Sequence, residues 1–96
     1  MQIIDDNTVV VNNSEEFKKA LSEENDYNYI YLGNDITLTS GFTINANKTN
    51  LIIDGTYNNV KYTYTNNLNE SSDVIEASTS NRKITLKNMN IISSHT

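Results

Sequence analysis

The chain has 96 residues, no Cys and no Pro, and 12 acidic residues against 7 basic ones give it a formal net charge of −5. A chain without Cys has neither disulfides nor thiolate metal sites. An acidic chain also lacks the basic face that nucleic acids and anionic membranes bind. No apolar run reaches the roughly 20 residues of a membrane-spanning helix. We therefore expect one small domain with no nucleic-acid partner and no membrane insertion.

Asparagine is the commonest residue type that can shape turns, with 17 Asn against 3 Gly. Asn tolerates the left-handed backbone region and hydrogen-bonds to its own main chain, so it can close tight corners. In stacked strands, Asn side chains can also bond to those above and below. The composition predicts that Asn makes turns for which other proteins use Gly and Pro.

The N-terminal quarter predicts a strand followed by a helix. Residues 8–11 are a short β-branched run, and Asn13 or Ser14 can cap a helix. Asn13 and Glu16 have the spacing of a capping box. The apolar side chains that follow recur at helical spacing on one narrow face: Phe17, Ala20 and Leu21. We expect this helix to end between residues 22 and 25 and to cover one open end of the core.

Three later stretches, 30–36, 51–55 and 84–91, share a pattern of alternating apolar residues followed by a turn. Aligning Leu32, Ile53 and Leu86 gives steps of 21 and 33 residues. A strand–turn–strand unit that recurs at such intervals is typical of stacked-coil proteins. The pattern predicts a mainly β fold, a parallel β-helix of about three coils, with these three residues in one core column. The predicted structural turn residues are Asn34, Asp54, Gly55 and Asn88.

Further strands are expected between the repeats, at residues 36–39, 42–44, 60–65 and 73–77. The second step is longer than the first because of additional residues between 57 and 72. Insertions in such folds lie in loops and leave the stack intact.

The order of these motifs resembles that of the pectate lyase-like adhesive domains of Gram-positive surface proteins. The resemblance rests on the capped helix at 16–21 and on segments 30–38, 51–55 and 84–91, and it covers nearly all of the chain after Val9. It implies a right-handed parallel β-helix with an N-terminal capping helix. It also implies an extracellular or cell-surface location in a bacterium.

The predicted organisation is a single domain, 1–96, with a cap strand and helix in 1–26 and coils in 27–96. The first residues do not have the pattern of a signal peptide, and residues 91–96 follow a strand without a capping element. We expect the N-terminal portion of a longer β-helix. Because an open strand edge recruits another chain, we also expect self-association through the last coil.

The carboxylates do not form a recognisable catalytic set. A β-helix lyase needs several carboxylates around Ca²⁺ and a basic residue that takes the substrate proton. Asp54 and Asp35 stand at turns of successive coils, where they could share a cation. Alternatively, Asp54 and Asn88 bond to the backbone of their turns. Arg82 and His95 are interpreted as a solvated turn residue and part of the chain end. We predict no catalytic residues, metal site or cofactor.

The tyrosines are the candidate ligand-binding residues. If Ile30 and Leu32 face the core, Tyr29 and Tyr31 face outward, and Tyr62 and Tyr64 share one side of a later strand. Exposed Tyr offers a large, rigid surface with a polar tip, suited to a polysaccharide or to a host or cell-wall protein. Alternatively, Tyr29 or Tyr31 packs under the helix or a flanking loop.

Two functions follow from the sequence. The first is a non-catalytic surface module, structural or adhesive, in a bacterial surface protein. The alternative is the capping end of a polysaccharide-active lyase or hydrolase whose catalytic coils lie beyond residue 96.

Overall fold

The computed structural model describes residues 1–38, 44–45, 48–66 and 83–93. The strand predicted at 73–77, most of that at 42–44, and the interpretations of Arg82 and His95 lie outside these residues.

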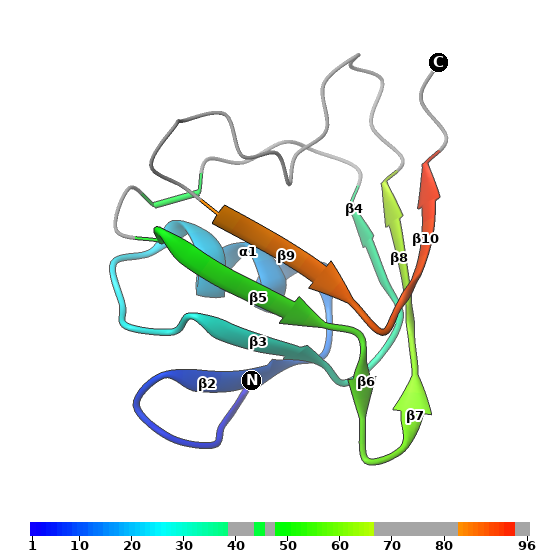
Figure 1. Ribbon diagram of the computed structural model, residues 1–96, viewed down its shortest axis with the longest axis horizontal. Helices are drawn as coiled ribbons and strands as arrows, with labels where there is room; N and C mark the ends of the chain where they lie inside the picture. The colour runs from blue at the N-terminus through cyan, green and yellow to red at the C-terminus, as the bar shows by residue number, and fades with distance from the viewer. Residues whose placement is uncertain (39–43, 46–47, 67–82, 94–96) are drawn as a thin grey trace.

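The described residues form a mainly β structure with one short helix, as the sequence predicts (Figure 1). The elements, in chain order, are β1 (Gln2–Ile3), β2 (Thr8–Val11), α1 (Ser14–Ser22), β3 (Tyr29–Leu32), β4 (Ile36–Leu38), β5 (Asn50–Asp54), β6 (Thr56–Tyr57), β7 (Val60–Lys61), β8 (Thr63–Asn66), β9 (Lys83–Lys87) and β10 (Asn90–Ser93). The structure adds β1, which the sequence did not predict. It also divides the predicted strand 60–65 between β7 and β8.

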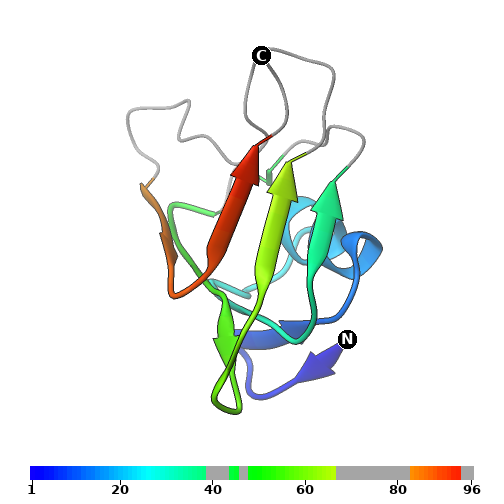
Figure 2. The ribbon, with the colours of Figure 1, turned by 90° about the vertical axis from the view of Figure 1, so that its right-hand side faces the viewer.

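Two sheets contain most of these strands. The first has five strands in the order β1-β2-β3-β5-β9, and all neighbours except β1 and β2 are parallel. The second has three parallel strands in the order β10-β8-β4, which run side by side in Figure 2. The strands β6 and β7 form a separate antiparallel hairpin.

The chain alternates between the first sheet and a second layer. The strand β3 is followed by β4, β5 by the hairpin and then β8, and β9 by β10. The helix α1 follows β2 in the same way and packs against β2 and β4 (Figure 1). It therefore occupies the position that a strand of the second sheet would otherwise have, next to β4.

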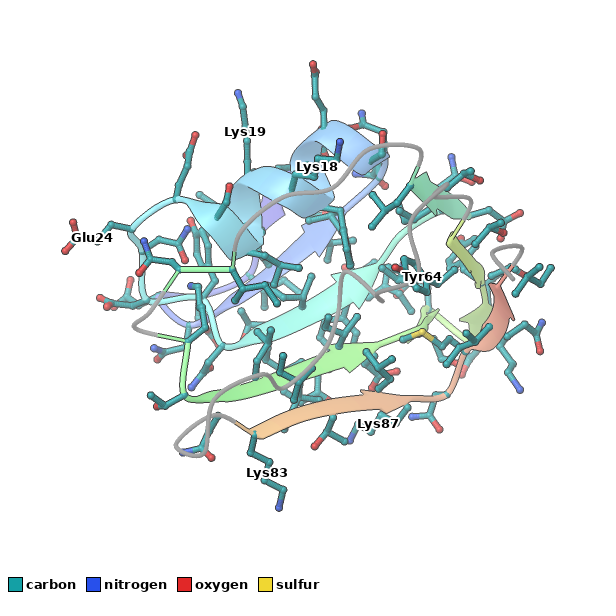
Figure 3. The ribbon with its side chains drawn as sticks, turned by 90° about the horizontal axis from the view of Figure 1, so that it is seen from above. Lys18, Lys19, Glu24, Tyr64, Lys83 and Lys87 are labelled. Atoms are coloured by element: carbon teal, nitrogen blue, oxygen red, sulfur yellow. The ribbon has the colours of Figure 1, made fainter. Side chains whose placement is uncertain are left out.

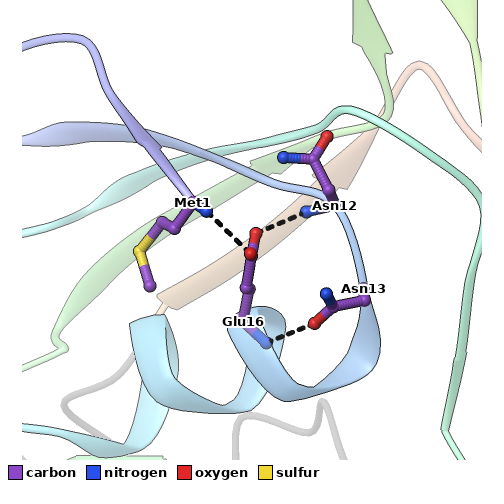
Figure 4. Close-up of polar contacts among 4 residues, drawn as sticks. All are labelled: Met1, Asn12, Asn13 and Glu16. Atoms are coloured by element: carbon purple, nitrogen blue, oxygen red, sulfur yellow. Dashed lines mark hydrogen bonds and ion pairs between the residues drawn. The ribbon is translucent and has the colours of Figure 1, made fainter.

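The start of α1 is fixed by hydrogen bonds close to those of a capping box (Figure 4). The side-chain oxygen of Asn13 accepts from the Glu16 amide at 2.9 Å, which confirms the predicted N-cap. The Glu16 carboxylate accepts from the Asn12 amide at 3.0 Å, one residue before the position that the capping box uses. It also pairs with the Met1 ammonium at 2.7 Å, and this contact lowers the pKa of Glu16.

The core lies between the first sheet, α1 and the second sheet. Residues on the inner side of β2, β3 and β5 are at most 1% exposed, as are the apolar residues of α1. The described core residues are Val9, Val11, Phe17, Ala20, Leu21, Ile30, Leu32, Ile36, Leu38, Ile44, Leu51, Ile53 and Tyr64. Figure 3 shows Tyr64 inside the molecule, whereas Lys19 of α1 points away from it.

The strand register corrects the predicted core column. Ile53 lies opposite Ile30 in β3 and Leu86 in β9, whereas Leu32 lies opposite Val11 in β2. The aligned column is therefore Val9, Ile30, Ile53 and Leu86. Alternation repeats every two residues, so a shift of two positions preserves the inward face and changes only the partner. Leu32 and Ile53 are buried as predicted, and Leu86 packs partly buried against the same core.

Within the described residues, α1 is the only helix, and neither its length nor its composition would let it cross a membrane.

Candidate functional site

The outer face of the first sheet carries a cluster of tyrosines. Because Ile30 and Leu32 point into the core, Tyr29 and Tyr31 point outward, where both are partly exposed. Their ring centroids are 4.9 Å apart. The Tyr57 ring joins them from the β6–β7 hairpin, with its centroid 5.4 Å from that of Tyr31 and its plane tilted by 51°. The prediction of an outward Tyr29 and Tyr31 therefore agrees with the structure.

The hairpin that positions Tyr57 turns on two asparagines. Asn58 and Asn59 have φ values of 53° and 66°. Positive φ at both central residues is the requirement of the two-residue turn that matches the twist of a hairpin, and Asn accepts it at little cost. Asn88, between β9 and β10, also has a positive φ, of 56°. In the described residues, every positive-φ position is an Asn, in agreement with the predicted role of Asn in turns.

Asp54 connects the tyrosines to these turns. It is 6% exposed, and one carboxylate oxygen accepts from the Tyr29 hydroxyl at 2.8 Å. The other oxygen accepts from the Thr56 amide at 3.0 Å and from the Asn88 side-chain amide at 3.3 Å. A buried carboxylate is costly unless such donors surround it. Asp54 thus holds β3, the hairpin and the β9–β10 turn together.

Gly55 allows the successive turns to stack closely. A Cβ atom at this position would lie 2.1 Å from the Met89 Cβ and 2.8 Å from the Asn88 carbonyl oxygen. The Gly55 amide donates to the Lys87 carbonyl at 2.9 Å, and the Thr56 hydroxyl donates to the Asn88 carbonyl at 2.8 Å. Any side chain at Gly55 would push these two turns apart.

The surroundings of Tyr29 raise the pKa of its phenol. Burial raises the pKa of its phenol, and the Asp54 carboxylate acts in the same direction. The Lys87 ammonium, 5.4 Å from the Tyr29 ring centroid, opposes this effect. Figure 3 places Lys87 on the rim of the molecule, on β9. The net result is a neutral phenol that donates to Asp54.

An open groove of about 770 Å³ lies beside the tyrosine cluster. Tyr31 and Asp54 come from the first sheet, Tyr57 and the Asn58–Asn59 turn come from the hairpin, and residues between Ile4 and Thr8 line it from the N-terminal side. We call this the tyrosine groove. Its lining combines aromatic rings with amide and hydroxyl groups.

The structure does not bring the four predicted tyrosines together. Tyr64 is 4% exposed and stacks on Phe17 with ring centroids 5.8 Å apart, so it belongs to the core and not to the surface. Tyr62 shares that inward side and packs partly buried against the same core. The prediction that Tyr62 and Tyr64 share one side was correct, but the side that faces the core could not be predicted. No aliphatic residue in β8 marks the inward side, because Tyr64 itself occupies the core position.

The predicted turn acids occupy separate places. The Asp35 carboxylate accepts from the Thr63 amide at 2.8 Å. Asp54 lies in β5, where it is opposite Tyr31 of β3 and not opposite Asp35. Asn34 accepts from the Asp35 amide at 2.9 Å. The Asp54 carboxylate accepts from the Thr56 amide of its own turn, as predicted for it, whereas the Asn88 side-chain amide donates to the Asp54 carboxylate. Among the described residues, no three His, Cys, Asp or Glu side chains gather closely enough to hold a metal ion.

A second polar region surrounds Lys48, which is 2% exposed. Its ammonium donates to the Asn25 carbonyl at 3.1 Å, to the Asn25 side-chain oxygen and to the Tyr27 carbonyl. Burial lowers its pKa. Three acceptors satisfy all three donors of an ammonium group, so Lys48 fastens the segment before β3 and has no donor left for a ligand.

Sequence reasoning missed Tyr57 and the Asn58–Asn59 turn. The signal was present, because two Asn between short β-rich runs are typical of a tight hairpin. Reading residues 57–72 as one insertion hid this signal.

Comparison with known proteins gives one positive result. The family model of the pectate lyase-like adhesive domain matches residues 8–96. No curated protein and no solved structure matches the chain. The match begins at the first residue of β2 and covers every described element after it. The chain therefore belongs to the pectate lyase-like adhesive domain family.

Proposed function

We propose that the chain is a non-catalytic adhesive module of a bacterial surface protein, exposed at the cell surface, and that the tyrosine groove is its contact site. The observation behind this proposal is that the groove has partly exposed aromatic side chains, whereas its buried carboxylate is occupied by structural hydrogen bonds. Tyr31 and Tyr57 are partly exposed and line the groove, whereas the Asp54 carboxylate accepts three structural hydrogen bonds. Family membership suggests an adhesive role.

The same proposal includes the fold. We propose a right-handed parallel β-helix in which α1 and β2 are the cap and β3 to β10 belong to the coils. Parallel pairing of β2-β3-β5-β9 and of β4-β8-β10 supports it, as does the regular alternation of the chain between the two layers.

Adhesion can be tested with beads coated with the purified chain. We expect the beads to be retained on cultured epithelial cells or on isolated cell walls, and soluble chain to compete with them. Beads coated with the Ile53→Asp variant, which we expect to be unfolded, provide the control. Equal retention of the two kinds of bead on every surface would contradict the proposal.

We further propose that the module self-associates through β9 and β10, with a second copy of the chain as the partner. Among the described strands these two are edge strands, and Ile91 and Ile92 of β10 are 54% and 52% exposed. Edge strands with exposed apolar residues recruit further strands. Sedimentation velocity should show a concentration-dependent dimer that Ile91→Lys weakens. A single monomeric species at high concentration would contradict this proposal.

A further inference from the structure

We propose that the tyrosine groove binds a neutral saccharide and rejects acidic ones. The inference rests on the adhesive function proposed above and specifies its ligand class. It follows from the aromatic pair, the uncharged polar groups, the sign of the charges and the preformed shape of the groove.

The aromatic pair suits the ring of a sugar. Tyr31 and Tyr57 are partly exposed, and their planes meet at 51° with centroids 5.4 Å apart. Both rings line the groove, where their exposed parts offer an apolar surface for the C–H face of a pyranose. The phenol oxygens at the ring edges remain available to hydroxyl groups, because Tyr combines an apolar body with a polar tip.

The uncharged polar groups of the groove suit hydroxyl ligands. Asn58, Asn59 and Asn88 line it together with Thr8. A side-chain amide offers both donors and an acceptor, and a threonine hydroxyl both donates and accepts. Sugar hydroxyls also donate and accept, so the amides of Asn58 and Asn59 can each serve a pair of neighbouring hydroxyls. The Asn88 amide already donates to Asp54. Asn58 and Asn59 are exposed at the tip of the hairpin, where a ligand can reach them.

The charges of the groove disfavour an acidic ligand. Its charged lining residues among those described are Asp5 and Asp54, both acidic. The ammonium of Lys87 lies over the Tyr29 ring, and Lys87 is not part of the lining. The whole chain carries a net charge of −5. A uronic acid polymer would meet a negative potential from both the groove and the molecule.

The groove is held in shape before any ligand arrives. The hydrogen bonds of Asp54 hold the Thr56 backbone and the Asn88 side chain in place. Contacts that exist before binding reduce the entropy that binding costs. A volume of about 770 Å³ also lies in the range of small-molecule sites, about 300–1,000 Å³. Asp54 is thus a positioning residue, and Tyr31 and Tyr57 are the contact residues.

The test is a titration of the chain followed by amide NMR. The neutral probes are cellohexaose, maltohexaose and chitohexaose, and the acidic probe is hexagalacturonate. We expect at least one neutral probe to shift the amide signals of Tyr31, Tyr57 and the Asn58–Asn59 turn. Hexagalacturonate should bind at least tenfold more weakly. Tighter binding of hexagalacturonate than of every neutral probe would overturn the inference.

Variants identify the groove as the site. Tyr57→Ala should weaken binding of the neutral probe at least tenfold, and Lys61→Gln on the same hairpin, which does not line the groove, should leave binding unchanged. The spectrum of each variant away from the hairpin reports whether it is folded. If Tyr57→Ala disturbs the hairpin, Asn58→Asp tests the same site, because it adds a charge while keeping a turn-forming residue. Undiminished binding in folded Tyr57→Ala or Asn58→Asp would overturn the inference.

The two proposals can fail separately. If coated beads adhere to cells but none of the three neutral probes shifts the groove signals, the saccharide inference is wrong and the adhesive function stands. If the beads do not adhere and a neutral probe still binds in the groove, the site is correct and its adhesive role is wrong.

Discussion

At the N-terminal end of the molecule, β2 pairs with β1 and packs against α1, whereas among the described residues β9 and β10 each pair with one neighbouring strand. We call these the capped end and the open end of the described strands. The difference shows in burial. Val9, Ile30 and Ile53 of the inward column are at most 1% exposed, but Leu86 at its end is only partly buried. In stacked-strand folds, each strand is stabilised mainly by its contacts with the strands next to it. We therefore expect stability to fall from the capped end to the open end.

The largest effect should come from a charge in the middle of the column. Ile53 is 1% exposed between Ile30 and Leu86. An unpaired buried carboxylate costs several kcal/mol, which is comparable with the whole stability of a small domain, about 5–15 kcal/mol. Ile53→Asp should therefore unfold the chain, as seen by circular dichroism. Ile52→Asp, on the outer face of the same strand, is the matched control and should remain folded.

A pair of Leu→Ala changes compares the two ends directly. Leu21 of α1 is fully buried, so Leu21→Ala should cost about 2–5 kcal/mol. Leu86→Ala, at the open end, should cost roughly 1 kcal/mol because less of its side chain leaves water on folding. Urea unfolding measures both. A larger loss of unfolding free energy for Leu86→Ala than for Leu21→Ala would contradict the expected difference in stability between the two ends.

Asn-containing turns, apolar alternation and helix-capping signals predicted the helix and most of the described strands, because these features depend on local chemistry. The capped helix, its apolar face and the alternating strands around Ile30 and Ile53 could all be read from the sequence. The register could not, because a period of two leaves shifts of two positions equivalent. Only one of the two contact tyrosines of the groove could be predicted from the sequence. Tyr31 follows from alternation, whereas Tyr57 depends on how a hairpin folds back onto the sheet.

The capped end also depends on one side chain at the start of its helix. Asn13→Ala removes the hydrogen bond to the Glu16 amide and should destabilise the chain by about 1 kcal/mol. Asn13→Asp retains an acceptor and should cost less. Urea midpoints of the two variants measure the difference, and an equal loss for both would show that a side-chain acceptor at residue 13 does not stabilise the chain.

The smallest expected effect concerns alkaline pH at the tyrosine cluster. The pKa of Tyr29 is raised in the folded state, so its neutral form contributes stability that is fully present below the ordinary tyrosine pKa of about 10. That contribution is lost as the pH rises through the higher folded pKa. A titration followed by tyrosinate absorbance should therefore show one tyrosine that ionises at a higher pH than an ordinary tyrosine, and Tyr29→Phe should remove this step. A difference titration at or below the ordinary tyrosine pKa would contradict this prediction.

Residue-level hydrogen exchange tests the difference between the ends most directly. The Gly33 amide donates to the Val11 carbonyl at 2.8 Å near the capped end, and the Asn90 amide donates to the Tyr62 carbonyl at 3.1 Å at the open end. At a concentration where the chain is monomeric, the Gly33 amide should exchange more slowly than the Asn90 amide, with Gly55 between them. Equal protection at all three amides, or the opposite order, would contradict a stack that is closed at one end and open at the other.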